Sequence, residues 1–110
     1  MVKDWVPDAG ETIWVDLNPT VGHEQAGKRP ALVLSPASYN GKTSLLLACA
    51  MTTEIKGYPF EVLLSDGKSA VLADQVKCLD WRMRNAQPKD SVPADVLQRV
   101  RDLLRTLLQI

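Results

Sequence analysis

Metal ligands and disulfide-forming residues are scarce in this sequence. Its 110 residues contain one histidine and two cysteines, and no group of carboxylates has the spacing of a metal motif. Cys49 and Cys78 each lie in an apolar, strand-like stretch, which favours buried thiols over a disulfide. The sequence therefore predicts neither a metal site nor a cofactor.

Long apolar runs are also missing. The longest, residues 45–51, is far shorter than the roughly 20 residues that a membrane-spanning helix needs. The stretch from Met1 to Asp4 carries no apolar core of a signal peptide. We expect a cytoplasmic protein with no membrane segment.

Charge of either sign is not in excess. Lysine and arginine number 13, aspartate and glutamate also 13, and the isoelectric point lies near 6.6. This balance argues against a surface that binds nucleic acid through overall positive charge, although a local basic patch could still hold a phosphate backbone. The alternative is that the cations are dispersed and solvated. The candidates for a patch are Lys28, Arg29, Lys42, Lys56, Lys77, Arg82 and Arg84.

The chain is organised as short strands followed by one helix, in a length that fits a single domain over residues 1–110. Glycine and proline punctuate the strand patterns, with turn signals at Asn18-Pro19, Asn40-Gly41, Lys56-Gly57 and Asp66-Gly67. The predicted strands are residues 12–17, 31–35, 44–51, 60–64 and 70–79, with 81–85 as a further candidate.

The period of the apolar residues changes to helical spacing after Pro93. Such an amphipathic helix could bind a membrane or a partner, but covering the core of a barrel is the favoured use. Many short strands and one helix favour a small curved barrel over a sandwich. The apolar face of the helix comprises Val96, Leu97, Val100, Leu103, Leu104, Leu107 and Leu108.

One polar segment separates the first two predicted strands. Residues 22–30 hold the histidine, a carboxylate, two cations and two glycines. Strands on both sides would fix this loop against a sheet, and loops fixed in that way commonly carry chemistry. Glu24 and Arg29 would offer a proton acceptor and a permanent cation to one substrate, the pair that phosphodiester cleavage requires. The alternative is a solvated turn in which the two form a surface ion pair that contributes little to stability.

Several sequence blocks around this loop occur in a known order and spacing. They resemble the MazF/PemK family of toxin endoribonucleases, and its MazF branch in particular. The blocks are residues 10–15, 18–20, 22–36, 52–53, 56–62 and 72–77.

This resemblance implies a fold and an activity. The fold is mainly β with a C-terminal α-helix, a small SH3-like half-open barrel that usually forms a homodimer. The implied activity is metal-independent cleavage of single-stranded RNA such as mRNA, which leaves a 2′,3′-cyclic phosphate and a free 5′-hydroxyl. RNA supplies the nucleophile, so the protein needs only groups that move protons and stabilise phosphate charge. The expected partner is a cognate antitoxin with an acidic, flexible tail.

The resemblance also assigns catalytic roles to four residues. Glu24 corresponds to the general base, and Arg29 to a clamp whose planar fork can bind two phosphate oxygens together. Thr52 corresponds to a phosphate-binding hydroxyl, expected at a sheet edge beside the Glu24 loop; the alternative is an ordinary threonine at a strand end. His23 either assists proton transfer, as in the PemK branch, or contacts RNA. Leu72 replaces an arginine of the PemK mechanism, which favours the MazF type.

Substrate binding is expected on a wider set of residues. Tyr58 and Phe60 offer flat faces for stacking on bases, and the amide of Gln75 can read base edges. Core packing is the alternative for Phe60. The full set is Gln25, Lys28, Thr53, Lys56, Tyr58, Phe60, Asp74 and Gln75.

Two other function classes remain open on the sequence. A toxin with the same barrel inhibits DNA gyrase by binding, as CcdB does, but that mode depends on a tryptophan near the C-terminus, and this chain ends Leu107-Leu108-Gln109-Ile110. A noncatalytic RNA-binding barrel is the other possibility. The presence of Glu24, Arg29 and Thr52 together argues against it.

Overall fold

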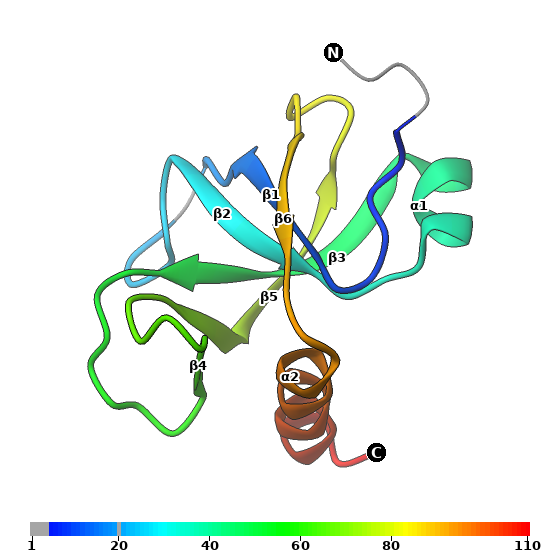
Figure 1. Ribbon diagram of the computed structural model, residues 1–110. Coiled ribbons are helices and arrows are strands. Elements are labelled where there is room, and N and C mark those ends of the chain that lie inside the picture. The colour runs from blue at the N-terminus through cyan, green and yellow to red at the C-terminus, as the bar shows by residue number, and fades with distance from the viewer. Residues whose placement is uncertain (1–4, 20) are drawn as a thin grey trace.

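Six antiparallel strands form one curved sheet in the order β4-β5-β3-β2-β1-β6 (Figure 1). The computed structural model describes residues 5–19 and 21–110, so Thr20 of the motif blocks and the stretch from Met1 to Asp4 lie outside the described residues. The elements are β1 (Glu11–Asp16), β2 (Lys28–Val33), α1 (Ala37–Thr43), β3 (Leu45–Thr52), β4 (Glu61–Leu63), β5 (Ala70–Asp80), β6 (Gln87–Ser91) and α2 (Ala94–Leu108).

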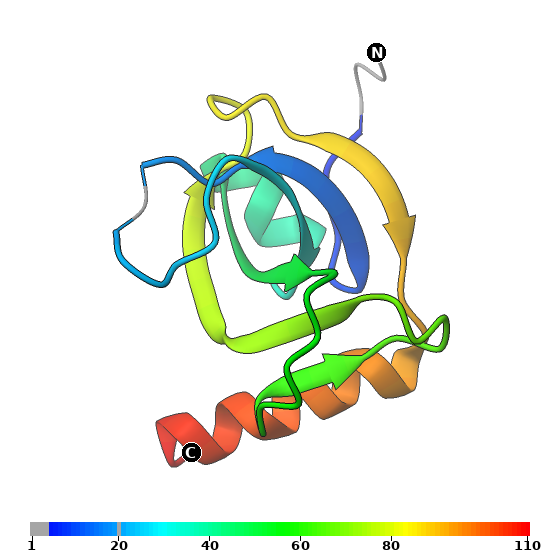
Figure 2. The ribbon, with the colours of Figure 1, turned by 90° about the vertical axis from the view of Figure 1, so that its left-hand side faces the viewer.

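The sheet curls around itself and leaves β4 and β6 as its two edges (Figure 2). Alternate side chains of its strands point inward, which is the period of two that the sequence shows. The predicted half-open, mainly β barrel with a C-terminal helix is confirmed. The apolar cluster inside the curve contains Ile13, Val15, Leu17, Ala31, Val33, Leu46, Ala48, Ala50, Leu79, Trp81 and Ala86.

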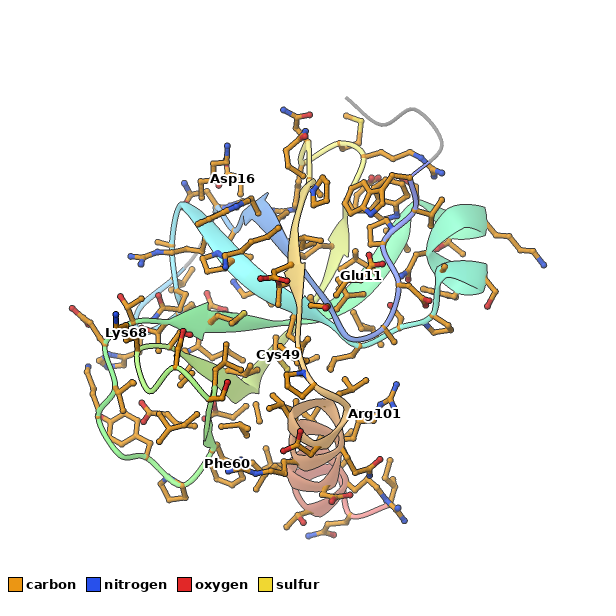
Figure 3. The ribbon with its side chains drawn as sticks, viewed as in Figure 1. Glu11, Asp16, Cys49, Phe60, Lys68 and Arg101 are labelled. Atoms are coloured by element: carbon orange, nitrogen blue, oxygen red, sulfur yellow. The ribbon has the colours of Figure 1, made fainter. Side chains whose placement is uncertain are left out.

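A second apolar layer lies between the sheet and α2. Val96 and Val100 of the helix are buried there against Leu32 and Val71 of the sheet. Cys49 belongs to the same layer (Figure 3). The helix covers the core, as predicted, because this packing removes its apolar face from water.

The apolar face predicted for α2 is not buried at the C-terminal end of the helix. Leu97, Leu103 and Leu104 pack partly buried against the second layer. Leu107 and Leu108 do not: they are 44% and 62% exposed. The helical period continues to these residues, but the sheet does not cover them.

A short helix stands where the sequence predicted a turn at Asn40-Gly41. Both residues lie inside α1, and the side chain of Asn40 is fully buried. Its Nδ2 donates to the backbone oxygens of Pro7 (2.8 Å) and Ser35 (2.9 Å), and its Oδ1 accepts from the Ser35 hydroxyl at 2.7 Å. These partners satisfy the amide, so a residue typical of turns is stable in the interior.

The last strand also differs from the prediction. Residues 81–85 form turns, in which Asp80 accepts the backbone N–H of Met83 at 3.1 Å. Strand β6 follows at Gln87–Ser91 and pairs with β1 at an edge of the sheet. An edge strand that is mostly exposed needs no alternating apolar residues, and it tolerates Pro88.

The two cysteines have different environments. Cys49 is buried, and burial raises the pKa of its thiol to about 12, which keeps it protonated and inert. Cys78 is exposed, so the prediction of two buried thiols is wrong for this residue. It lies on the outward side of β5, where residues alternate between the two faces.

Candidate active site

The polar loop between β1 and β2 is closed at its base by hydrogen bonds. The backbone N–H of Leu17 donates to the oxygen of Gly27 at 2.9 Å, and the N–H of Gly27 donates to the Asn18 side chain at 3.1 Å. The Arg84 guanidinium donates to the backbone oxygens of Asp16 and Asn18. The loop therefore leaves and rejoins the sheet at fixed points, as predicted from its flanking strands.

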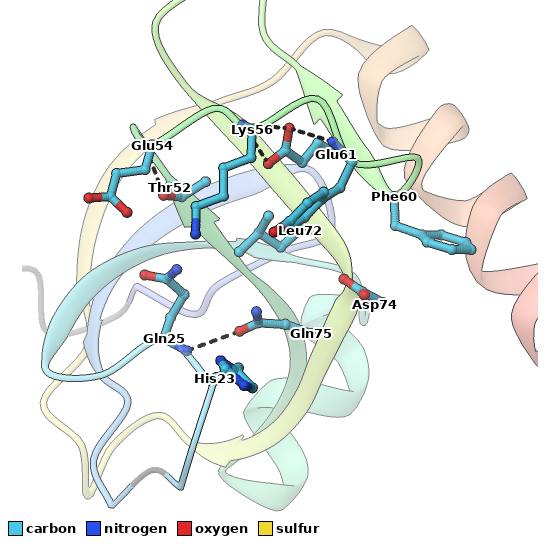
Figure 4. A pocket seen from close by; sticks show the side chains of 11 residues that line it. His23, Gln25, Thr52, Glu54, Lys56, Phe60, Glu61, Leu72, Asp74 and Gln75 are labelled. Carbon is cyan, nitrogen blue, oxygen red and sulfur yellow. Dashed lines mark hydrogen bonds between the residues drawn. The ribbon is translucent and has the colours of Figure 1, made fainter.

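The tip of the loop lies against β5. The backbone N–H of Gln25 donates to Oε1 of Gln75 at 3.0 Å, and Oε2 of Glu24 lies 3.5 Å from Nζ of Lys77 (Figure 4 shows the first contact). Gln75 and Lys77 are two residues apart, so they share one face of the strand. Two neighbouring loop residues thus contact two side chains of the same strand.

The Glu24 carboxylate is exposed and held ionised. Its Oε1 accepts the backbone N–H of Val21 at 2.7 Å. This bond, followed by the charge of Lys77, lowers the pKa of Glu24 below its usual value. The carboxylate is therefore unprotonated at neutral pH.

Arg29 stands on β2, opposite Val15 of β1. Its Nε donates to the backbone oxygen of Ala26 at 3.1 Å, and the residue is exposed. In the described part of the chain Glu24 pairs with Lys77 and not with Arg29. The alternative of a Glu24–Arg29 surface ion pair is therefore wrong.

A pocket opens between this loop, the end of β3, the β3–β4 loop and β5 (Figure 4). It brings together most of the predicted site residues, which come from three separate parts of the sequence. Its lining residues are His23, Gln25, Thr52, Glu54, Lys56, Tyr58, Phe60, Glu61, Leu72, Asp74 and Gln75.

Four predicted site residues do not line the pocket. Glu24 precedes the lining residue Gln25 and turns its carboxylate toward Lys77. Lys28 and Arg29 lie at the start of β2, and Thr53 follows the end of β3. The side chains of these four residues are not part of the pocket wall.

Thr52 lines the pocket. It ends β3, where it pairs with Ala70 of β5 and lies beyond Ala50, the last β3 residue that pairs with β2. Its Oγ1 accepts the backbone N–H of Glu54 at 3.0 Å. That bond uses the hydroxyl as an acceptor, so its proton can still be donated into the pocket.

The two predicted stacking residues differ in accessibility. Phe60 is half-buried, and its ring points toward α2, where it packs against the second apolar layer (Figure 4). Tyr58 is 60% exposed, with Nζ of Lys56 at 5.9 Å from its ring centroid. Tyr58 is thus the ring more available to a base, while core packing accounts for most of the surface of Phe60.

Sequence reasoning missed two carboxylates of the pocket wall, Glu54 and Glu61. Glu61 belongs to a motif block, but its contacts depend on how the preceding loop folds back. Among the described residues, no group of three or more histidine, cysteine, aspartate or glutamate side chains is arranged to hold a metal. The helices in that part of the chain also include none long and apolar enough to cross a membrane.

Comparisons with known proteins define the class. A sequence model of the PemK-like, MazF-like toxins of type II toxin–antitoxin systems matches residues 8–108. The chain belongs to this family.

Individual relatives match nearly the whole chain. It is 50% identical over 110 residues to the endoribonuclease toxin MazF of Escherichia coli K12, covering 98% of this chain and 99% of that protein. The crystal structure of MazF from Deinococcus radiodurans matches with a TM-score of 0.92 and 53% identity, covering 97% of this chain and 100% of the other. A MazE–MazF crystal structure from D. radiodurans matches with a TM-score of 0.87 and 53% identity, covering 97% and 99%.

Proposed function

We propose that this protein is the toxin of a type II toxin–antitoxin system and cleaves single-stranded RNA through attack by the 2′-hydroxyl. The endoribonuclease class rests on full-length similarity to the E. coli enzyme, half of whose residues it shares. The finer proposal is that cleavage of RNA such as mRNA, in the cytoplasm, leaves a 2′,3′-cyclic phosphate and a 5′-hydroxyl without a metal cofactor.

The observation that carries this proposal is the pocket beside the docked β1–β2 loop. Its wall combines an exposed aromatic ring, a lysine, amides and a hydroxyl, which suit an unpaired nucleotide. Near it in the fold, Glu24 of the β1–β2 loop supplies an ionised carboxylate, and Arg29 at the start of β2 supplies an exposed guanidinium whose Nε donates to Ala26. In this proposal Glu24 takes the proton of the 2′-hydroxyl, while Arg29 and Thr52 stabilise the charge on the phosphate oxygens.

His23 is assigned an RNA contact in this scheme. It lines the pocket, next to the proposed base. Leu72 lines the pocket as well, at the position where the PemK branch has an arginine. We therefore place the chemistry in the MazF type, with Glu24 as the base.

An antitoxin is the proposed regulating partner. The matched D. radiodurans structure is a MazE–MazF complex. An acidic segment would fit the cations around the pocket, Lys28, Arg29 and Lys56, and would compete there with RNA. Its affinity should fall with added salt, because attraction between exposed charges is screened over about 8 Å at physiological ionic strength.

A homodimer is proposed from the exposed outer face of the central strands. Leu47 of β3 and Val76 of β5 are 42% and 39% exposed on adjacent strands. A second copy would cover apolar surface that a monomer leaves in water. Sedimentation should report twice the chain mass, and Leu47→Asp should shift the protein toward the monomer.

The experiment that tests the proposal is cleavage of a long RNA in excess EDTA, with the ends of the products mapped. Discrete cuts with cyclic-phosphate and 5′-hydroxyl ends are expected. Cleavage that stops on chelation, or fragments with 5′-phosphates, would contradict the mechanism. Inhibition of DNA gyrase without RNA cleavage would instead favour the CcdB-like alternative.

A further inference from the structure

Glu61 folds its carboxylate back over the loop that precedes it. Its Oε1 accepts the backbone N–H groups of Lys56 (3.2 Å), Gly57 (2.8 Å) and Tyr58 (3.3 Å), and its Oε2 accepts that of Lys56 at 3.1 Å (Figure 4). Successive backbone N–H groups that converge in this way form a concavity for an anion. Here a carboxylate of the same chain fills the concavity.

The backbone of Glu61 is fixed to the sheet, whereas the loop it holds is irregular. Glu61 is the first residue of β4 and pairs with Leu72 of β5. The preceding residues 54–58 belong to no strand or helix. Gly57 has φ +76°, in the left-handed region that favours glycine, which lets three successive N–H groups face one side. The hydrogen bonds to this carboxylate therefore hold this part of the loop in a fixed position relative to the sheet.

Two side chains of the proposed RNA-binding surface depend on that loop. Lys56 and Tyr58 line the pocket from exposed positions, and their backbone N–H groups are the ones that Glu61 holds. A flexible loop would have to be ordered on binding, which weakens affinity. A loop ordered in advance avoids this loss.

We propose that Glu61 is a positioning residue, whose carboxylate shapes the β3–β4 loop so that Lys56 and Tyr58 are presented to RNA. The assignment rests on the proposed function of the pocket. It concerns the binding of substrate and not the transfer of protons, which is left to Glu24.

A positioning role and a purely electrostatic role of Glu61 predict opposite changes in RNA affinity when Glu61 is removed. A carboxylate in the wall of an RNA-binding pocket repels phosphate, so its loss through charge alone would tighten RNA binding. Loss of a positioning contact weakens binding, because Lys56 and Tyr58 become mobile. The direction of the change in KM therefore separates the two explanations.

The test compares Glu61→Ala and Glu61→Gln with a matched control, using a short single-stranded RNA that the native protein cuts. Glu61→Ala should raise KM roughly tenfold or more. The kcat should change much less, since the loss falls equally on ground state and transition state. Glu61→Gln keeps one acceptor oxygen, so its KM should lie between those of the native protein and Glu61→Ala. If Glu61→Ala does not fold, the KM of Glu61→Gln is compared with that of the native protein instead.

Asp66→Ala is the control. Asp66 caps the neighbouring β4–β5 turn by accepting the N–H groups of Lys68 (2.8 Å) and Ser69 (3.2 Å). Its removal takes away the same charge and the same kind of cap outside the pocket wall. KM should stay the same or fall slightly.

Backbone amide exchange by NMR supplies a readout that needs no activity. The N–H groups of Lys56, Gly57 and Tyr58 should exchange slowly in the native protein and rapidly in Glu61→Ala, with no change in Asp66→Ala. Faster exchange together with a higher KM supports the assignment. Unchanged exchange, or a lower KM, would overturn it. If the native protein did not cut RNA, the proposed function would fail, and the exchange data alone would still decide whether Glu61 holds the loop.

Discussion

Replacement of Glu24 by glutamine isolates the proposed proton acceptor. The new amide oxygen can still accept the N–H of Val21, which the carboxylate now accepts at 2.7 Å. The contact between Gln25 and Gln75 does not involve the Glu24 side chain and is kept. Only the negative charge, its contact with Lys77 and the capacity to take a proton are lost.

The expected loss is therefore chemical. Removal of a positioned general base typically costs about 10² to 10⁴-fold in rate, so the kcat of Glu24→Gln should fall in that range. RNA binding should not weaken, because the change removes a negative charge near a polyanion. Single-turnover cleavage of a labelled RNA measures the rate, and titration with a noncleavable analogue measures the affinity.

A rate within a few fold of that of the native protein, in a folded variant that binds RNA normally, would rule out Glu24 as the base. Glu24 would then be only a loop residue that caps Val21 and contacts Lys77. The base would have to be sought elsewhere in the pocket, and His23 would be the first candidate.

Four further predictions concern the loop and its contact with Lys77 of β5. Arg29→Lys should lose as much activity as Glu24→Gln, because an ammonium cannot bind two phosphate oxygens through a planar fork; a near-native rate in steady-state assays would count against the clamp. His23→Ser should stay within about tenfold of the native rate, and a thousandfold loss would point to the PemK mechanism. The proposed base, Glu24, can take a proton only when it is ionised, so activity should persist above its lowered pKa and disappear as the pH falls through it. Lys77→Met removes one cause of that lowering and should move the acidic limb of the rate profile to higher pH; an unmoved limb would show that Lys77 does not tune Glu24.

The spacing of apolar residues predicted those strands and helices whose burial follows a regular period along the chain. The alternation in β1 and the helical period around Val96 and Val100 both appear in the sequence and both hold in the structure. Helix α1 escaped prediction because Asn40 finds its partners in Pro7 and Ser35 only after the chain has folded.

In the site, too, features set by neighbouring residues were predicted, and features set by tertiary contacts were not. The loop with Glu24 and Arg29 is visible as a motif, because its residues are adjacent in the chain. The contact of Gln25 with Gln75 joins residues 50 positions apart, and no spacing rule predicts it. The orientation of Glu24 toward Lys77, and of Phe60 toward α2, likewise depends on tertiary packing.

The proposed nucleophile that this site activates is the 2′-hydroxyl of the RNA. Its role is tested most directly by measuring the cleavage of an RNA oligonucleotide that has one 2′-deoxy nucleotide immediately 5′ of the cut bond. The all-ribose oligonucleotide is measured under identical conditions for comparison. The deoxy substrate should bind with similar affinity and should not be cut at that bond. Undiminished cleavage at that bond would contradict the mechanism, because the attacking oxygen would then have to come from another group.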